Sequence, residues 1–184
     1  MAVKIIMADI TQQEVDVVVN SANQALLGGG GVDGAIHKAA GPELYDHIKK
    51  YFRETQTGSR LPHADEMTGV TPTPGYIITP AFKLPAKFIA HFVLPSEYDP
   101  KNRDWYSIHV RDTFLRMIQK LQASFGAKSF AVPAIGCGIF GYEPKLIADI
   151  LTEFRNYDGL HMLICLPNDA ELYSVFQNSL GVTA

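Results

Sequence analysis

Two glycine-rich segments constrain this chain more than any other feature of its sequence. One spans Gly28 to Gly34 and the other Gly136 to Gly141, and each contains a G-x-G-x-x-G string that leads into a helical pattern. Glycine lets backbone N–H groups approach an anion closely, and a helix start adds unpaired N–H groups. The pair predicts a clamp on the phosphates of a nucleotide. The alternative is that these glycines only make tight turns.

The hydrophobic pattern predicts an α/β fold. Valine-rich or alternating apolar runs indicate strands at residues 3–7, 15–19, 76–79, 88–93, 130–132 and 161–166. Helical spacing is seen over residues 36–52, with a break at Gly41-Pro42, and again over 108–121, 144–154 and 170–180. Residues 56–75, rich in Gly, Pro and Thr, indicate a loop or an edge hairpin. Alternating strands and helices predict a largely parallel sheet covered on both faces, with ligands bound beyond the carboxyl ends of its strands.

Composition narrows the function. The chain has 184 residues, 47% of them hydrophobic, and a net charge of -3, which favours a single domain over residues 1–184. No long basic stretch is present, so duplex nucleic acid is not an expected partner. Neither a membrane span nor a signal-peptide layout is seen, so we expect a cytoplasmic protein. The two cysteines, Cys137 and Cys165, lack the spacing of a disulfide framework or a zinc site.

Other nucleotide folds fit less well. A Rossmann motif closes its first strand directly, whereas about ten residues separate the first glycine segment from the preceding strand. The second segment follows a strand, but only one further strand pattern remains after it. No G-x-x-x-x-G-K-[ST] string occurs, so a Walker A loop is also excluded.

Four stretches resemble the macrodomain family. Residues 8–23 resemble the opening of macrodomains, and residues 28–42 look like the signature of the MacroD-type branch. Residues 84–91 match its middle strand and 133–142 its second loop. The resemblance implies a three-layer α/β/α sandwich with a mixed, largely parallel sheet and a pocket for ADP-ribose. It also implies hydrolysis of mono-ADP-ribose from acidic side chains of proteins and deacetylation of O-acetyl-ADP-ribose, or else a non-catalytic reader of ADP-ribosylated proteins.

The resemblance assigns polar residues to both ends of the ligand. Asp9 would accept from the exocyclic amine of adenine, assisted by the backbone of Ile10. Asn23 and Asn20 would face the distal ribose. The alternative for Asp9 is a turn or helix cap, and for the asparagines it is turn formation through their own backbone.

Asp33 and His37 are the expected catalytic pair, together with Asn23. In the MacroD-type pattern this aspartate acts on a water near the distal ribose, although a substrate phosphate is an alternative base. His37 lies one helical turn later and can face the same side. The plainer alternatives are a helix N-cap for Asp33 and an ordinary half-buried histidine for His37.

Both glycine segments are expected to contact the ligand. In the first, Gly30, Gly31 and Val32 are the expected contacts. In the second, backbone N–H groups would wrap the diphosphate, Phe140 would pack against the distal ribose and Tyr142 would close that side; the expected contacts are Gly136, Cys137, Gly138, Ile139, Phe140, Gly141 and Tyr142. We expect no cofactor beyond the ligand itself.

One departure from the family pattern concerns Gly136 and Cys137. Many MacroD-type members carry Ser-Thr there, so this chain lacks two hydroxyl groups near the expected phosphates. Cys137 also suggests a nucleophile, but no companion motif supports that role. His37, His91 and Cys137 do not match a zinc spacing, and no metal is expected. Oligomeric state and protein target are not indicated by the sequence.

Overall fold

The computed structural model describes residues 2–23, 26, 28–55, 75–95 and 97–181, and for residues 51–55 the backbone alone. A six-stranded sheet lies at its centre in the order β1-β6-β5-β2-β4-β3. Every neighbouring pair is parallel except β3 and β4. The strands are β1 (Val3–Met7), β2 (Val17–Ala22), β3 (Tyr76–Pro80), β4 (Phe88–Val93), β5 (Ser129–Val132) and β6 (His161–Leu166). The predicted mixed, largely parallel sheet is confirmed.

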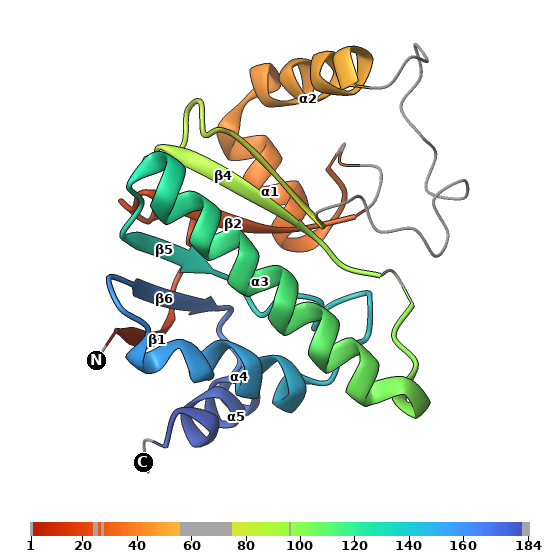
Figure 1. Ribbon diagram of the computed structural model, residues 1–184, viewed down its shortest axis with the longest axis vertical. Coiled ribbons are helices and arrows are strands. Elements are labelled where there is room, and N and C mark those ends of the chain that lie inside the picture. The colour runs from red at the N-terminus through yellow and green to blue at the C-terminus, as the bar shows by residue number, and fades with distance from the viewer. Residues whose placement is uncertain (1, 24–25, 27, 56–74, 96, 182–184) are drawn as a thin grey trace.

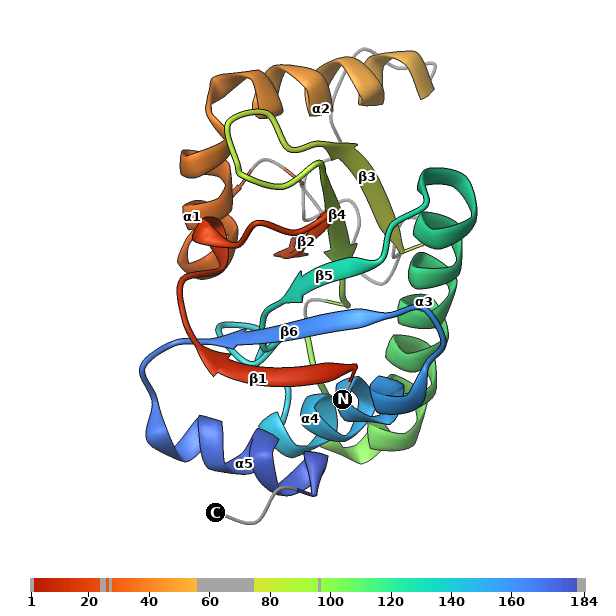
Figure 2. The ribbon, with the colours of Figure 1, turned by 90° about the vertical axis from the view of Figure 1, so that its left-hand side faces the viewer.

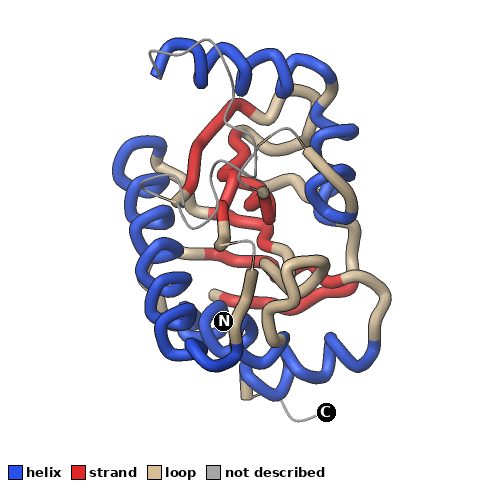
Figure 3. The backbone as a smooth tube through the Cα atoms, turned by 90° about the vertical axis from the view of Figure 1, so that its right-hand side faces the viewer, coloured by secondary structure: helices blue, strands red, loops and turns tan. Residues whose placement is uncertain are grey.

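Helices cover both faces of this sheet, so the fold has the three layers expected (Figures 1 and 2). On one face lie α1 (Gly31–Ala40) and α2 (Pro42–Thr55). On the other lie α3 (Arg103–Phe125) and α4 (Pro144–Thr152), with α5 (Ala170–Leu180) packed beside α4 and β1. Figure 3 shows the strands enclosed between the helices. Short 3-10 turns complete the description at η1 (Ile10–Gln12), η3 (Pro100–Asn102) and η4 (Glu153–Asn156).

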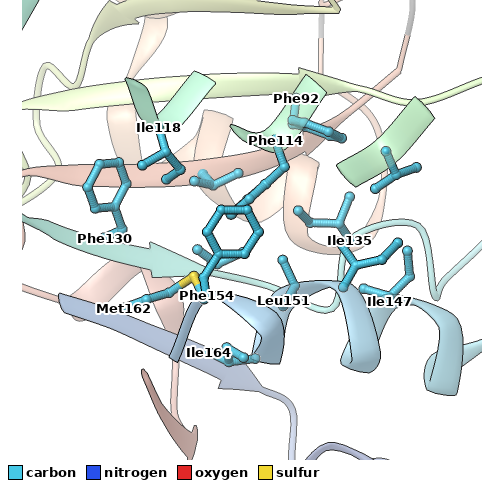
Figure 4. Close-up of a cluster of buried hydrophobic side chains, with 14 of the residues drawn as sticks. Phe92, Phe114, Ile118, Phe130, Ile135, Ile147, Leu151, Phe154, Met162 and Ile164 are labelled. Atoms are coloured by element: carbon cyan, nitrogen blue, oxygen red, sulfur yellow. The ribbon is translucent and has the colours of Figure 1, made fainter. Parts of the chain in front are cut away.

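Because side chains along each strand alternate between the two faces of the sheet, the hydrophobic core consists of two clusters. Along β2, Val17 and Val19 face the layer of α3 and α4, while Val18 faces the layer of α1 and α2. Aromatic and aliphatic side chains fill the first cluster, where Phe92 and Phe114 pack edge to face with ring centroids 5.9 Å apart (Figure 4). Burial of this apolar area is the dominant stabilising contribution.

The helical predictions hold with one correction. The break at Gly41 is confirmed: this residue ends α1 with φ of 93° and donates its N–H to the carbonyl of His37. Ile108 was expected on the buried face of α3 but is 66% exposed. It lies two residues from both Tyr106 and Val110, which are buried, and two residues correspond to about 200° around a helix. Residues 56–74 of the segment predicted as a loop or edge hairpin lie outside the described residues.

The topology brings both glycine segments to one edge of the sheet. Strands β2 and β5 are parallel neighbours, with Val18 paired to Ala131. The first glycine segment follows β2 and the second follows β5 directly, so both lie beyond the carboxyl ends of adjacent strands. Among the described residues, no helix is long and apolar enough to span a membrane.

Candidate functional site

The first glycine segment forms the start of α1. Gly30 is the N-cap residue and supplies no side-chain hydrogen bond, so the N–H groups of the first turn have no side-chain cap among the described residues. Gly34 is required for packing, because a Cβ there would lie 2.2 Å from the carbonyl oxygen of Gly29. The segment therefore folds back on the helix and presents backbone donors and the positive end of the helix dipole.

The second segment is a compact loop with a buried base and an open tip. Gly136 has φ of +74°, and a Cβ there would lie 2.6 Å from Leu94 Cδ1 and 2.8 Å from Tyr142 Cδ2. Its N–H donates to Ser21 Oγ at 3.2 Å. At the tip, no hydrogen bond among the described residues occupies the N–H of Gly138, Ile139 or Phe140. Three consecutive free donors are typical of an anion-binding loop.

A cavity of about 300 Å³ lies between the two segments. Its lining comes from the end of β2, the first segment with the start of α1, and the second segment: Ser21, Asn23, Gly29, Gly30, Gly31, Val32, Asp33, Pro133, Ala134, Gly136, Gly138, Ile139 and Phe140. Free backbone donors on both sides make this space suitable for an anionic group.

Some residues predicted as ligand contacts do not line this cavity. Tyr142 is buried beneath the second loop, where its hydroxyl donates to the carbonyl of Pro95 at 2.9 Å. The side chain of Asn20 is fully buried behind Asp33. Cys137 and Gly141 belong to the loop but not to the lining. The sequence places all four next to the cavity, but strand and loop geometry directs them away from it.

Asp33 is the buried carboxylate of the cavity wall. It is the third residue of α1, so the N-cap alternative is wrong. Its Oδ1 accepts a hydrogen bond of 2.8 Å from Asn20 Nδ2. Burial raises the pKa of Asp33 above its ordinary value, although the bond from Asn20 and the proximity of His37 act in the opposite direction. A carboxylate with a raised pKa suits general base chemistry.

His37 lies beside Asp33 but outside the cavity lining. Its Nε2 is 3.4 Å from Asp33 Oδ1 and makes no hydrogen bond among the described residues. Burial lowers the pKa of His37, and this effect is larger than the rise caused by the nearby charge of Asp33. The ring is therefore neutral near pH 7 and contacts Asp33 as a polar group without a full charge.

Asn23 combines the two roles considered for it. Its Oδ1 accepts from the N–H of Leu26 at 3.0 Å, and its Nδ2 donates to the carbonyl of Gly28 at 3.3 Å. These bonds fix the turn into the first segment, as the structural alternative expected. Asn23 also lines the cavity, and a Cβ added at Gly29 would lie 3.4 Å from its Nδ2 and 3.5 Å from Asp33 Oδ2.

Asp9 borders a second, more open hollow beyond the ends of β1 and β6. The lining residues are Met7, Ala8, Asp9, Leu166, Pro167 and Asn168. Asp9 also caps η1: its Oδ1 accepts from Thr11 N at 2.9 Å and from Thr11 Oγ1 at 2.7 Å. These bonds lower the pKa of Asp9, which leaves an ionised acceptor facing the solvent. Ile10 is buried and outside this lining.

Nucleophile and metal chemistry are not supported by the described residues. Burial raises the pKa of Cys137 to about 12, which keeps the thiol protonated near pH 7. No group of three or more His, Cys, Asp or Glu side chains within the described ranges is arranged to hold a metal ion.

Sequence reasoning overlooked several contributors to the site. Ser21 both lines the cavity and holds Gly136, and Pro133 and Ala134 form part of the same wall. The signal was available, since all three residues lie at the carboxyl ends of β2 and β5. The buried Thr79, which contacts His91, was also overlooked, and His91 itself was considered only as a zinc ligand.

Fold and site together define a three-layer α/β/α domain with a cavity, lined by backbone donors, between two glycine loops. A family model described as Macro domain matches residues 19–151. The chain therefore belongs to the macrodomain family, as the resemblance implied.

Relatives and solved structures agree with this assignment. An O-acetyl-ADP-ribose deacetylase of Escherichia fergusonii is 40% identical over 148 residues, which cover 80% of this chain and 75% of that protein. The macrodomain of Oceanobacillus iheyensis, solved with ADP, superposes with a TM-score of 0.80 at 30% identity, over 97% of this chain and 90% of that one. A Trypanosoma brucei macrodomain in complex with ADP-ribose gives 0.70 at 26% identity, over 98% and 69%.

Proposed function

We propose that this macrodomain binds ADP-ribose and hydrolyses carboxylate esters formed with the distal ribose of that ligand. The observation that carries the proposal is the position of Asp33: a buried carboxylate with a raised pKa lies in the wall of a cavity whose other walls present free backbone N–H groups. Relatives named O-acetyl-ADP-ribose deacetylase support ester hydrolysis as the reaction.

The two hollows suggest how the ligand lies. Asp9 would accept from the adenine amine beside Leu166 and Pro167, in the hollow at the ends of β1 and β6. The diphosphate would lie between the start of α1 and the free N–H groups of the second loop, where neutral amides replace lysine or arginine. The distal ribose would then approach Asn23 and Asp33.

The reaction follows from the chemistry of a carboxylate ester. Water attacks the acyl carbon while Asp33 accepts its proton, and the bond between the acyl carbon and the ribose oxygen breaks. The proton passes to the ribose oxygen, which leaves a free hydroxyl and a carboxylic acid. O-acetyl-ADP-ribose and a glutamate- or aspartate-linked ADP-ribosyl group contain the same type of ester. We therefore propose both as substrates, with ADP-ribosylated proteins as partners.

The second candidate is a reader that binds ADP-ribosylated proteins without cleaving them. It is favoured by the absence of side-chain hydroxyl groups at Gly136 and Cys137, near the proposed phosphates. Against it, Asp33 is held by Asn20 at 2.8 Å in the cavity wall, and a binding module does not need a desolvated carboxylate there.

Product analysis separates the two candidates. The protein is incubated with O-acetyl-ADP-ribose and, separately, with a protein carrying glutamate-linked mono-ADP-ribose, and free ADP-ribose is quantified by chromatography. A hydrolase releases ADP-ribose from both at a rate proportional to enzyme concentration. Gly138→Val, which would place a side chain in the diphosphate site, is the control with weakened binding, and it should release less ADP-ribose at low substrate concentration. Binding of ADP-ribose by calorimetry with no release from either substrate would establish the reader instead.

A further inference from the structure

A chain of buried polar side chains extends from Asp33 across three strands. Asn20 on β2 and His91 on β4 are paired in register, and Asn20 Nδ2 lies 3.1 Å from His91 Nδ1. On β3, Thr79 Oγ1 lies 3.0 Å from His91 Nε2. Asn20 and His91 are fully buried and Thr79 is 2% exposed. We refer to Thr79, His91, Asn20 and Asp33 as the polar chain.

All members of the polar chain lie on the face of the sheet covered by α1 and α2. Their strand neighbours on that face are apolar, among them Val18, Ile77 and Ile89. Burying polar groups among such side chains is costly unless they are hydrogen-bonded. Asn20, His91 and Thr79, which lie next to one another on three strands, therefore indicate a role that apolar residues could not fill.

The hydrogen bonds of the polar chain have one consistent direction. Asn20 Nδ2 carries two hydrogens, and one is donated to Asp33 Oδ1. The other points to His91 Nδ1, which must then be the unprotonated acceptor nitrogen. His91 Nε2–H donates to Thr79 Oγ1, and the Thr79 hydroxyl donates to the carbonyl of Pro80 at 3.1 Å.

The surroundings keep His91 in the neutral form that this direction needs. Burial, together with smaller contributions from the nearby His37 on α1 and His47 on α2, lowers the pKa of His91 to about 3. The ring centroids of His37 and His91 are 6.0 Å apart. His91 therefore acts as a fixed acceptor for Asn20 near neutral pH, and a rotated Asn20 amide would place its oxygen against the acceptor nitrogen of His91.

We propose that His91 is a positioning residue for the hydrolysis proposed above: it fixes the amide of Asn20, and Asn20 in turn fixes Asp33 through Oδ1 so that Oδ2 faces the cavity beside Gly29. The expected effect on kcat rests on the proposed function. The expected effect on the Asp33 carboxylate does not depend on the proposed function. Neither His91 nor Asn20 lines the cavity, so neither is expected to contribute to ADP-ribose affinity.

The test uses two nearly isosteric variants. His91→Asn places an amide oxygen as many bonds from Cα as Nδ1, so it can still accept from Asn20. His91→Leu introduces a side chain with the same branching as asparagine but without a hydrogen-bond acceptor. We expect His91→Leu to lower kcat on O-acetyl-ADP-ribose by about 10- to 100-fold, the range for a displaced catalytic group. Its KM and its Kd for ADP-ribose should stay close to wild type, and His91→Asn should recover most of kcat.

Carboxyl NMR titration provides a readout that does not depend on turnover. The bond from Asn20 lowers the pKa of Asp33, so His91→Leu should raise that pKa and His91→Asn should restore it. Among the described residues, His37 is the titratable neighbour of Asp33, and His37 and His47 are those of His91; imidazole signals are followed in a parallel titration. Should the wild type bind ADP-ribose without hydrolysis, the proposed function fails while this titration still tests the positioning of Asp33.

A second pair covers the case in which His91→Leu does not fold. Thr79→Val removes the acceptor of His91 Nε2–H, while Thr79→Ser keeps a hydroxyl at the same position. We expect Thr79→Val to lower kcat and raise the pKa of Asp33, and Thr79→Ser to remain near wild type. A folded His91→Leu, or Thr79→Val, with wild-type kcat and wild-type Asp33 titration would overturn the proposal.

Discussion

An alanine at Gly136 and one at Gly138 should have opposite consequences although the two positions are in one loop. At Gly136 a Cβ would lie 2.6 Å from Leu94 Cδ1 and 2.8 Å from Tyr142 Cδ2, well inside carbon–carbon contact distance. The φ of +74° is also in the left-handed region. At Gly138 a Cβ meets no atom within 4 Å, and no positive φ applies.

The magnitude follows from these contacts. A left-handed conformation costs a non-glycine residue about 1–2 kcal/mol, and overpacking in a well-packed region costs about 1–3 kcal/mol. Lower entropy of the unfolded chain offsets about 0.4–1 kcal/mol. Gly136→Ala should therefore lower the free energy of unfolding by about 1–5 kcal/mol. For a domain of this size that corresponds to a fall of about 2–18 °C in Tm. Gly138→Ala should leave Tm unchanged or slightly raised.

Thermal unfolding followed by circular dichroism measures the Tm of both alanine variants, and calorimetry measures the affinity for ADP-ribose. Gly138→Val should fold like wild type but bind ADP-ribose about 10- to 100-fold more weakly, because one or more charge-assisted hydrogen bonds of about 1.5–3 kcal/mol are lost. Equal Tm values for Gly136→Ala and Gly138→Ala would refute the packing argument. Undiminished affinity in Gly138→Val would refute the diphosphate site.

Three further outcomes are expected. Asp9→Ala should weaken ADP-ribose binding by about 1–3 kcal/mol in calorimetry, whereas a loss of stability alone would mean that Asp9 is only the cap of η1. Asp16 accepts hydrogen bonds from Lys128 N and Ser129 N, which with other contacts lower its pKa in the folded state to about 2. Ionised Asp16 therefore stabilises the fold at pH values above its unfolded-state pKa, and this stabilisation is lost as the pH falls through the folded-state pKa. Asp16→Ala should reduce the stability measured by urea unfolding at pH 7 but have little effect below pH ~2. Cys137→Ser should retain ester hydrolysis, and abolished turnover with ADP-ribose binding intact would restore the nucleophile hypothesis.

The sequence predicted the fold well because its signals are local. The valine-rich run 15–19 locates β2 (Val17–Ala22) to within three residues at each end, and Gly41-Pro42 identifies the junction of α1 and α2. The direction of individual side chains was less predictable. Tyr142 was expected to close the ligand site, but it packs beneath the loop because Gly136 bends the chain over it.

The candidate site was predictable as a set of positions but not as a geometry. Both glycine segments, Asn23 and Asp33 do line one cavity. However, the roles of Asn20 and His91 depend on strand register between β2 and β4, which no local pattern indicates. A polar residue within an apolar strand is the signal that could have found them, since such a residue needs a partner on a neighbouring strand.

Turnover by Asp33→Asn tests the central claim most directly. Asparagine retains the size and shape of the aspartate but cannot accept a proton from water near neutral pH. The account predicts that kcat on O-acetyl-ADP-ribose falls by about 10²- to 10⁴-fold while the Kd for ADP-ribose, measured by calorimetry on the same preparation, changes by less than about tenfold. Hydrolysis by Asp33→Asn at the wild-type rate would contradict it.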